Sequence, residues 1–453
     1  MGNSLLQHAA ATMAAVNRVV SFADAFRFWL KLGFISFGGP AGQIAIMHQE
    51  LVEKRRWISE ARFLHALNYC MLLPGPEAQQ LATYVGWLLH RTWGGLVAGL
   101  LFILPSLAIL LALSYLYVAY GHLAAVAAIF FGIKPAVVAI VAFAAWRIGG
   151  RVIRNAVLAG IAIAAFVALT VFGVPFPLVV LGAALLGWLG AKLSPASFEV
   201  QSHAVTASPE SAAIIDDHSS TPAHATFSWR RTLVVLGVGL LLWLAAMSCL
   251  IHLQGSSGTL PQMGGFFSKA ALVTFGGAYA VLPYVNQGAV EQYHWLTASQ
   301  MIDGLALGET TPGPLIMVVT FVGFVGGWSH AAAQGLTPGI AGLLGGLVVT
   351  FFTFLPSFVF VFAGAPLVEA TRGLRHFTAP LTAITAAIVG VIANLAVFFA
   401  WHVFWPAGLA RSPDWASLLI TAAAALALFR FRIGVIPVIV ACGIAGMTLR
   451  LGF

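Results

Sequence analysis

Long apolar runs, interrupted by short polar stretches, make up most of this chain. Six runs lie in the first half, at roughly 22–48, 62–90, 94–118, 123–147, 153–173 and 175–192. Seven follow, at about 231–251, 264–287, 299–326, 336–362, 377–401, 415–430 and 433–451. Most approach the ~20 residues that a helix needs to cross the hydrocarbon of a bilayer. Because open sheet edges are not tolerated in lipid, the pattern predicts an all-α polytopic membrane protein with about 13 membrane segments.

A polar stretch separates the two sets of runs. It is rich in Ser, Thr, Pro and His and lacks apolar periodicity, which is typical of a flexible linker. Its histidines, at positions 203, 218 and 224, are irregularly spaced, so no metal site is predicted. We therefore divide the chain into a first repeat (1–193), a cytoplasmic linker (194–229), one extra helix (230–252) and a second repeat (253–453).

The two repeats share an ungapped pattern of helix breakers. The run from Phe34 to Gln80 recurs 238 positions later, and Lys31 aligns with Lys269 at the same separation. The aligned features are a Phe-Gly-Gly motif (Phe37-Gly38-Gly39 and Phe275-Gly276-Gly277), a tryptophan (Trp57 and Trp295) and a Pro-Gly-Pro motif (Pro74-Gly75-Pro76 and Pro312-Gly313-Pro314). The single extra helix turns the second copy over, which predicts the inverted-topology repeats of many secondary transporters.

The distribution of Lys and Arg predicts the orientation of the chain. With a cytoplasmic N-terminus and a periplasmic C-terminus, most of these residues, including Arg147, Arg151 and Arg154, fall in inside loops. Lys54, Arg55 and Arg56 disagree if every run spans the membrane. Re-entrant hairpins at 22–48 and 62–90 would return their loop to the cytoplasm. Full spans remain the alternative, and the same choice applies to 264–287 and 299–326.

Composition narrows the class of protein. The chain is 60% hydrophobic and 8% charged, so its net charge of +8 reflects cytoplasmic loops and not nucleic-acid binding. Its three cysteines lie far apart and predict no disulfide, haem or zinc site. No Walker-type glycine loop is present, so we expect neither ATP hydrolysis nor another enzymatic activity, and no cofactor. The N-terminus carries no pattern of a cleaved signal peptide.

The broken helices suggest an anion site. Glycine permits the turn and the following proline suits a helix start, so each break presents free backbone N–H groups and the positive end of a helix dipole. Such ends bind anions near the middle of transporters. Ordinary packing kinks are the alternative. The candidate substrate-binding residues are Gly38, Gly39, Pro40, Pro74, Gly75, Pro76, Gly276, Gly277, Pro312, Gly313 and Pro314, with Ala278 replacing the second Phe-Gly-Gly proline.

Lysines in apolar surroundings are candidates for balancing the charge of an anion. Lys31 and Lys269 each precede a Phe-Gly-Gly motif by six residues. A cation in a membrane segment costs about 2.5–3.5 kcal/mol and so usually has a task, although snorkelling to the interface is the alternative. Lys134 is a third such cation, without a clear counterpart.

Few carboxylates lie inside the apolar runs. Glu77 follows the first Pro-Gly-Pro motif and Glu309 precedes the second, and we expect one or both to couple transport to protons. Their alternative role is as helix caps or dipole partners. Asp303 lies closer to a segment end. Gln79, Gln80 and Thr311 are candidate hydrogen-bond donors, although threonines in membrane helices often bond back to their own helix.

At these residues the chain resembles the chromate ion transporter (CHR) family in its long, two-domain form. The resemblance rests on FGGPAGQIAIMHQELVEKRRWISEARFLHALNYCMLLPGPEAQQLATYVG in the first half and on TFGGAYAVLPYV and GETTPGPL in the second. It covers all of the chain except the linker. It implies export of chromate across a bacterial inner membrane, with resistance as the result and sulfate as the expected competitor.

Three functions are weighed for this fold. The first is a secondary transporter, an antiporter that exports the oxyanion with the proton motive force. The second is an anion channel, or a transporter for uptake of sulfate or another oxyanion, and the third is a membrane enzyme, which would need a cofactor site. The expected partners are chromate, sulfate and the lipid bilayer. The oligomeric state is left open, and a homodimer is one alternative.

Overall fold

The computed structural model describes residues 20–37, 39–193, 198, 213–215, 223–275, 277–370, 378–408 and 411–452. Nearly all of these residues are helical, and no strand forms among them beyond an isolated bridge between Ile58 and Ile215. The prediction of an all-α polytopic protein is therefore confirmed. Much of the predicted linker, including His203 and His218, lies outside the described residues.

Within the part of the chain that the structure describes, six helices are long and apolar enough to cross a membrane, as judged from length and composition. They are α5 (Glu77–Tyr120), α6 (Ala124–Val152), α8 (Phe176–Leu193), α9 (Trp229–Gln254), α14 (Pro338–Ala370) and α15 (Thr378–Phe404). Shorter apolar helices are α7 (Ala156–Thr170), α13 (Val318–Ser329, preceded by the 3-10 turn Leu315–Met317), α16 (Trp415–Phe429) and α17 (Val435–Leu451).

Short helices flank the repeated motifs. In the first repeat they are α2 (Phe22–Ile35), α3 (Gly39–His48, continued by the π-helix Gln49–Lys54) and α4 (Glu60–Leu72). In the second they are α10 (Thr259–Val273), α11 (Ala278–Asn286, continued by the π-helix Gln287–Gln292) and α12 (Ala298–Thr310). Helices of about 13 residues extend about 20 Å, which is short of the ~30 Å hydrocarbon core. The predicted breaks in all four runs are therefore present.

The first repeat is built from two helical hairpins that open toward the same end of the molecule. Nε2 of His90 lies 2.8 Å from the carbonyl oxygen of Val20, so the first half of α5 ends beside the start of α2. The loop between α3 and α4 lies at this end too, since Ser59 donates its backbone N–H to Ile215. His224 contacts the carbonyl oxygen of Trp87 at 3.0 Å. We call this the linker end.

Helix α5 contains two helices joined by a sharp turn. His90 and Arg91 leave the helical conformation, with φ of −137° and 57°. The two halves then pack backbone to backbone, because a methyl group on Gly94 would lie 2.3 Å from the carbonyl oxygen of Gly86. The second repeat has the same close approach where Gly345 meets Gly323. Glycine is required at these points because no side chain fits between the helices.

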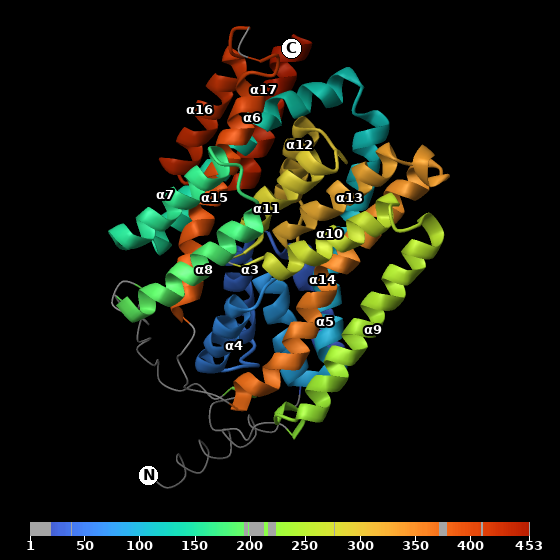
Figure 1. Ribbon diagram of the computed structural model, residues 1–453, viewed down its shortest axis with the longest axis vertical. Helices are drawn as coiled ribbons and strands as arrows, with labels where there is room; N and C mark the ends of the chain where they lie inside the picture. The colour runs from blue at the N-terminus through green and yellow to red at the C-terminus, as the bar shows by residue number, and fades with distance from the viewer. Residues whose placement is uncertain are drawn as a thin grey trace, which may run out of the picture.

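The second repeat enters from the opposite end. Figure 1 shows α9 running along the right side, away from the linker end, with α10 to α13 in the upper and central parts of the molecule. Helix α14 returns toward the linker end, where Tyr84 donates a 2.5 Å hydrogen bond to Glu369. The end that carries the last residues of α17 is called the far end. Both repeats therefore contain helical hairpins, the shape that the re-entrant alternative requires, and the two sets of hairpins meet from opposite ends.

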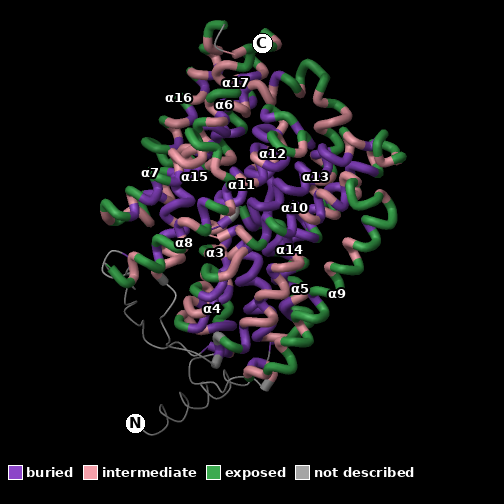
Figure 2. Tube along the Cα trace, in the orientation of Figure 1, coloured by how far each residue is buried: buried purple, intermediate pink, exposed green. Residues whose placement is uncertain are grey.

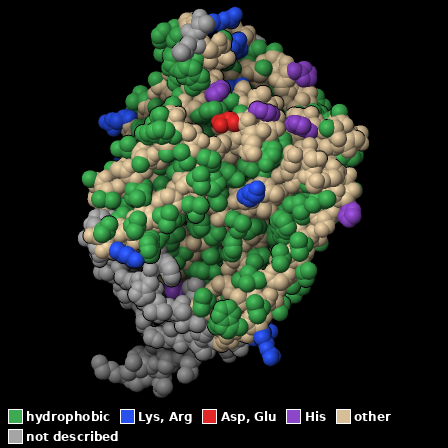
Figure 3. Space-filling view, in the orientation of Figure 1, with side chains coloured by type: hydrophobic (Ala, Val, Ile, Leu, Met, Phe, Trp, Pro, Cys, Tyr) green, Lys and Arg blue, Asp and Glu red, His purple; other side chains and the backbone are tan. Residues whose placement is uncertain are grey.

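Burial follows this arrangement. Figure 2 shows the buried residues concentrated where the hairpins of the two repeats meet, and exposed residues along α7, α8 and α9. The face shown in Figure 3 carries many hydrophobic side chains and few charged ones, as expected for a surface that faces lipid. Helices α6, α7, α8 and α15 to α17 form a layer to one side of the hairpins (Figure 1).

The basic loop at the linker end has its own ion pairs. Lys54 lies 2.8 Å from Glu50, and the hydrogen bond from Lys54 is the main reason that the pKa of this carboxyl is lowered. Arg55 lies over the rings of Phe28 and Trp57, with its Cζ 4.9 and 5.1 Å from their centroids. Desolvation on burial lowers the pKa of His224 at the same end.

Helix α6 extends past the predicted end of its apolar run. It reaches Val152 and contains Arg147 and Arg151, which were both assigned to an inside loop, whereas Arg154 follows the helix. The cytoplasmic location of these arginines stays a prediction.

Candidate functional site

The four motifs meet in one place and hold one another by backbone hydrogen bonds. Gly75 donates its N–H to the carbonyl oxygen of Thr274 at 2.7 Å, and Gly313 donates to Ser36 at 2.8 Å. Ser36 and Thr274 are the last residues before the two Phe-Gly-Gly motifs. Each Pro-Gly-Pro motif therefore binds the Phe-Gly-Gly motif of the other repeat.

The motif glycines adopt backbone conformations that L-residues avoid. Gly39, Gly75, Gly277 and Gly313 have φ of 69°, 127°, 97° and 107°. Pro76 is the N-cap of α5 and Pro314 that of the 3-10 turn, each one position earlier than the first helical position that the sequence suggested. The predicted helix starts after the breaks are nevertheless present. Gly38 and Gly276 lie outside the described residues.

Two serines of the long helices lie close against the glycines of the Pro-Gly-Pro motifs. A methyl group on Gly75 would lie 2.3 Å from Oγ of Ser357 in α14. One on Gly313 would lie 2.7 Å from Cβ of Ser106 in α5. Both serines are buried, and in both cases the serine comes from the repeat opposite to its glycine. We call the region where the four motifs meet the crossing. Side chains as well as backbone atoms of both repeats contact one another there.

Unused polar atoms are buried at the start of α5. Gln79 donates to Oγ1 of Thr83 at 2.9 Å and Gln80 to the carbonyl oxygen of Pro74 at 2.8 Å. The Oε1 atoms of both glutamines, and Oγ of Ser357, are buried with no hydrogen-bond partner. Each amide nitrogen has a second N–H, and the first turn of α5 leaves its backbone N–H groups free. The start of α5 therefore carries buried polar groups whose hydrogen-bonding capacity exceeds their contacts.

Gln43 bridges the crossing from α3. Its side-chain nitrogen donates to the carbonyl oxygens of Gly313 and Ser36, and its Oε1 is buried without a partner. A buried amide that links both repeats positions the two motifs relative to each other.

Two carboxylates approach the start of α11. A methyl group on Gly277, its N-cap, would lie 3.9 Å from Oε1 of Glu77. Glu309 accepts a short hydrogen bond from the Tyr279 hydroxyl on the first turn of α11. Arg147 of α6 interacts electrostatically with both Tyr279 and Glu309. Glu77 and Glu309 therefore both lie near the positive end of α11, where they would repel an anion bound to that end.

The predicted lysines lie elsewhere on their helices. Lys31 of α2 and Lys269 of α10 are both exposed, whereas their neighbours Leu32 and Ala270 are buried. Among the described residues, neither forms a hydrogen bond or ion pair with a motif residue. Their charge-balancing role stays a prediction. The half-buried Arg147 instead acts electrostatically on one of the two carboxylates, Glu309.

The threonines bond to their own helices. Thr311 donates to the carbonyl oxygen of Leu307 at 2.6 Å, and Thr310 donates to Ala306 at 3.1 Å. Their hydroxyl hydrogens are therefore already used, as the alternative reading of these residues anticipated. Thr311 remains buried beside the second Pro-Gly-Pro motif.

Sequence reasoning missed Gln43, Ser106, Ser357 and Arg147. The serines did leave a signal, because Leu104-Pro105-Ser106 recurs as Leu355-Pro356-Ser357. Their separation of 251 positions, from 106 to 357, differs from the 238 of the other motifs, so an ungapped alignment does not find them. Among the described residues, no group of three or more metal-ligating side chains is present.

Comparison with known proteins identifies the family. The chromate transporter family model matches residues 23–188 and again residues 261–447. The two matched regions begin 238 positions apart, the same separation as the repeated motifs. The chain belongs to the chromate transporter family. No solved structure matches it.

Relatives of this chromate transporter family member cover most of its length. It is 32% identical to the chromate transport protein of Pseudomonas aeruginosa, over 96% of this chain and 94% of that protein. It is 30% identical to the chromate transport protein of Cupriavidus metallidurans, over 82% and 81%. An uncharacterized transporter of Bacillus subtilis matches at 28% identity over 30% of this chain but 68% of its own length. That shorter relative is consistent with a family built from one or two repeats.

Proposed function

We propose that this multi-pass membrane protein is a secondary active transporter that exports chromate from the cytoplasm, driven by the proton motive force, and thereby confers resistance. Membership of the chromate transporter family supports chromate as the substrate. The direction of transport, the coupling to protons and the competition by sulfate are further parts of the proposal, which family membership alone does not supply. The proposed setting is a bacterial inner membrane with a cytoplasmic N-terminus and a periplasmic C-terminus, which the basic loop at the linker end supports.

The observation that carries this proposal is the crossing of the two repeats. Opposed hairpins tied by Gly75–Thr274 and Gly313–Ser36 place the starts of α5 and α11 in one region. Helix starts of this kind recognise anions in transporters that alternate access by moving one repeat against the other. A tetrahedral dianion would be held there by backbone N–H groups and by the amides of Gln79 and Gln80.

The carboxylates supply the coupling in this proposal. A dianion near Gly277 would lie beside Glu77, and two ionised groups that share such a site repel each other strongly. Protonation of Glu77 or Glu309 removes that repulsion. Anion occupancy and proton occupancy are then linked, as a coupled transporter requires. A channel needs no such linkage.

The decisive experiment is chromate uptake into inside-out membrane vesicles, with and without a proton gradient. We expect uptake against a chromate gradient when the vesicle interior is acidic, and its collapse when a protonophore is added. Excess sulfate should lower the initial rate by competition. Purely downhill flux, unaffected by the protonophore, would instead assign an anion channel.

A further inference from the structure

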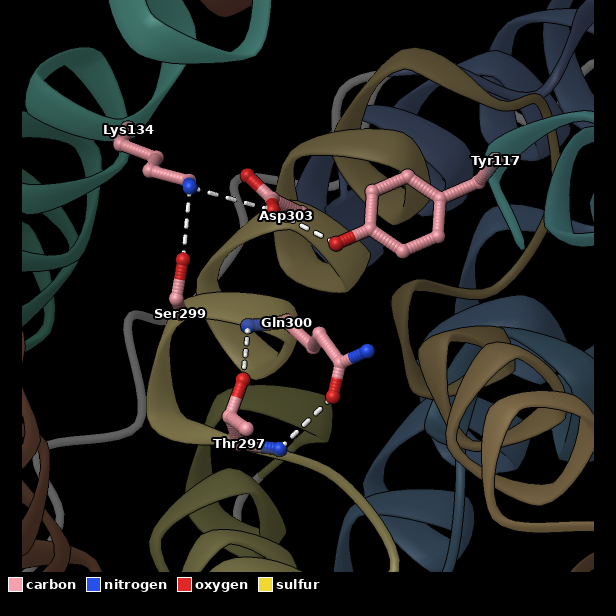
Figure 4. Close-up of polar contacts among 6 residues, drawn as sticks. All are labelled: Tyr117, Lys134, Thr297, Ser299, Gln300 and Asp303. Carbon is pink, nitrogen blue, oxygen red and sulfur yellow. Dashed lines mark hydrogen bonds and ion pairs between the residues drawn. The ribbon is translucent and has the colours of Figure 1, made fainter. Parts of the chain in front are cut away.

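A second polar cavity lies away from the crossing. It has a volume of about 400 Å³, is open on one side, and lies between the end of α5, α6 and the start of α12. The room corresponds to about a dozen water volumes. Figure 4 shows its polar residues converging from three elements. The polar lining used below consists of Tyr117, His122, Lys134, Ser299, Gln300 and Asp303.

An ion pair forms the wall of this cavity. Nζ of Lys134 lies 3.4 Å from Oδ2 of Asp303 and donates a 2.6 Å hydrogen bond to Oγ of Ser299. The Tyr117 hydroxyl donates to the same Oδ2 at 2.8 Å. The side chain of Asp303 is only 3% exposed, and its Oδ1 is buried with no partner. Lys134 is 29% exposed, so its ammonium group can meet a ligand from the cavity.

The first turn of α12 adds hydrogen-bond donors. Thr297 and Gln300 form a capping box in which Oε1 of Gln300 accepts from the backbone of Thr297, so the amide N–H₂ of Gln300 is left to donate. Ser299 accepts from Lys134 and keeps its own O–H to donate. Lysine, hydroxyl and amide donors beside a helix start suit a tetrahedral oxyanion.

The charged groups around Asp303 determine which ion pairs can form when its protonation state changes. Lys134 comes from α6, Tyr117 from α5, and His122 from the turn between α5 and α6. From α17, Arg450 lies over the Phe131 ring instead, 4.2 Å from its centroid. From α13, the cavity is lined by Trp328 and Ser329, which carry no charge. Lys134 thus has one anionic partner here, and a dianion entering the cavity would compete with it.

We propose that this cavity is a second oxyanion site, in which a tetrahedral dianion replaces Asp303 as the partner of Lys134 when Asp303 takes up a proton. The proposal deepens the proposed function and rests on it for direction. The end of α5 and helix α12, which line the cavity, lie toward the far end, opposite the linker (Figure 1), so the proton comes from water on that side. The proton binds the Asp303 carboxylate, and Lys134 is left free for the anion.

Exchange of a proton for the oxyanion is completed when Asp303 gives up that proton. Glu309 lies six residues further along α12, about 9 Å by the rise of a helix. When Asp303 passes its proton inward, its restored charge takes Lys134 back and expels the anion to the far side. One proton then moves inward as one oxyanion leaves, which is the exchange that an exporter needs.

The test uses sulfate, because sulfate remains a dianion across the neutral pH range and does not oxidise thiols. The full chain carries Ser329→Cys in the cavity lining, with the exposed Cys249 replaced by serine. The rate at which a charged methanethiosulfonate modifies the new cysteine is measured with and without sulfate. We expect sulfate to slow modification about tenfold near pH 6 and much less near pH 8, the scale of one charge-assisted contact.

Two further variants separate the roles. With Asp303→Asn, protection by sulfate should be strong and equal at both pH values, because no carboxylate competes for Lys134. With Lys134→Gln and Asp303→Asn together, a neutral pair avoids a buried unpaired charge and protection should disappear at both. Lack of protection in the parent protein, or pH dependence that survives Asp303→Asn, overturns the proposal. Chromate export by the parent protein is measured separately, so failure of the proposed function is recognised independently.

Discussion

Gly313 donates its backbone N–H to the carbonyl oxygen of Ser36 at 2.8 Å, and this bond joins the second Pro-Gly-Pro motif to the first Phe-Gly-Gly motif. Gly75 and Thr274 repeat the contact with the repeats exchanged, at 2.7 Å. Two equivalent bonds related by the repeat hold the ends of four hairpins together. Any movement of one repeat against the other must therefore pass through these contacts.

The glycines of the two crossing contacts should not tolerate a side chain. Gly75→Ala and Gly313→Ala place a methyl group 2.3 Å from Ser357 Oγ and 2.7 Å from Ser106 Cβ, at positive φ. The backbone strain alone is about 1–3 kcal/mol. We expect chromate export to fall more than about tenfold in both variants, measured in vesicles at equal protein level. Gly265→Ala on α10, with open space around it, is the control and should keep export.

Removing the charge of the central carboxylates should uncouple transport. Glu309→Gln keeps a hydrogen-bonding partner for Tyr279 but has no proton to release, and Glu77→Gln does the same beside Gly277. We expect proton-driven chromate accumulation to be lost in at least one variant while downhill chromate exchange persists. Vesicle assays with and without a gradient measure both activities.

The exposed Glu291 at the end of the π-helix that follows α11 gives a matched control, since Glu291→Gln changes charge without touching the crossing. If both central variants accumulate chromate as well as this control does, the coupling role is wrong.

The exposed lysines should act at a distance. Lysines on a lipid-facing surface extend their ammonium groups to the membrane interface, where they attract an anion before it binds and lose this effect in salt. We expect Lys31→Met and Lys269→Met to lower the export rate about two- to tenfold at low chromate, with the maximal rate retained. Added salt should erase the difference. Lys192→Met, at an exposed position on α8 where the ammonium lies 3.7 Å from the Trp188 ring centroid, is the control. Unchanged kinetics in both lysine variants would discard their role.

The hairpins predict which loops share a side. Glu53→Cys, in the π-helix after α3, should be labelled from the same side as Thr226→Cys near the linker, and Glu291→Cys from the other side. An impermeant maleimide applied to intact cells and to inside-out vesicles measures this. Labelling of position 53 from the periplasmic side would overturn the hairpin topology.

The class of protein and its internal symmetry follow from the amino-acid sequence alone. Apolar runs of membrane length fix helices, because no other open structure satisfies its backbone in lipid. The repeated glycines and prolines located the four breaks, which depend on local backbone freedom that a residue type encodes.

Which atoms meet at those breaks depends on the packing of the folded chain. The bond from Gly313 to Ser36 joins residues 277 positions apart, and nothing local specifies it. Ser106, Ser357 and Arg147 reach the site from long helices whose faces depend on packing, while Lys31 and Lys269 turn outward on theirs. A repeat in sequence shows that two segments are alike, but which side chains face each other depends on how the helices are rotated and packed.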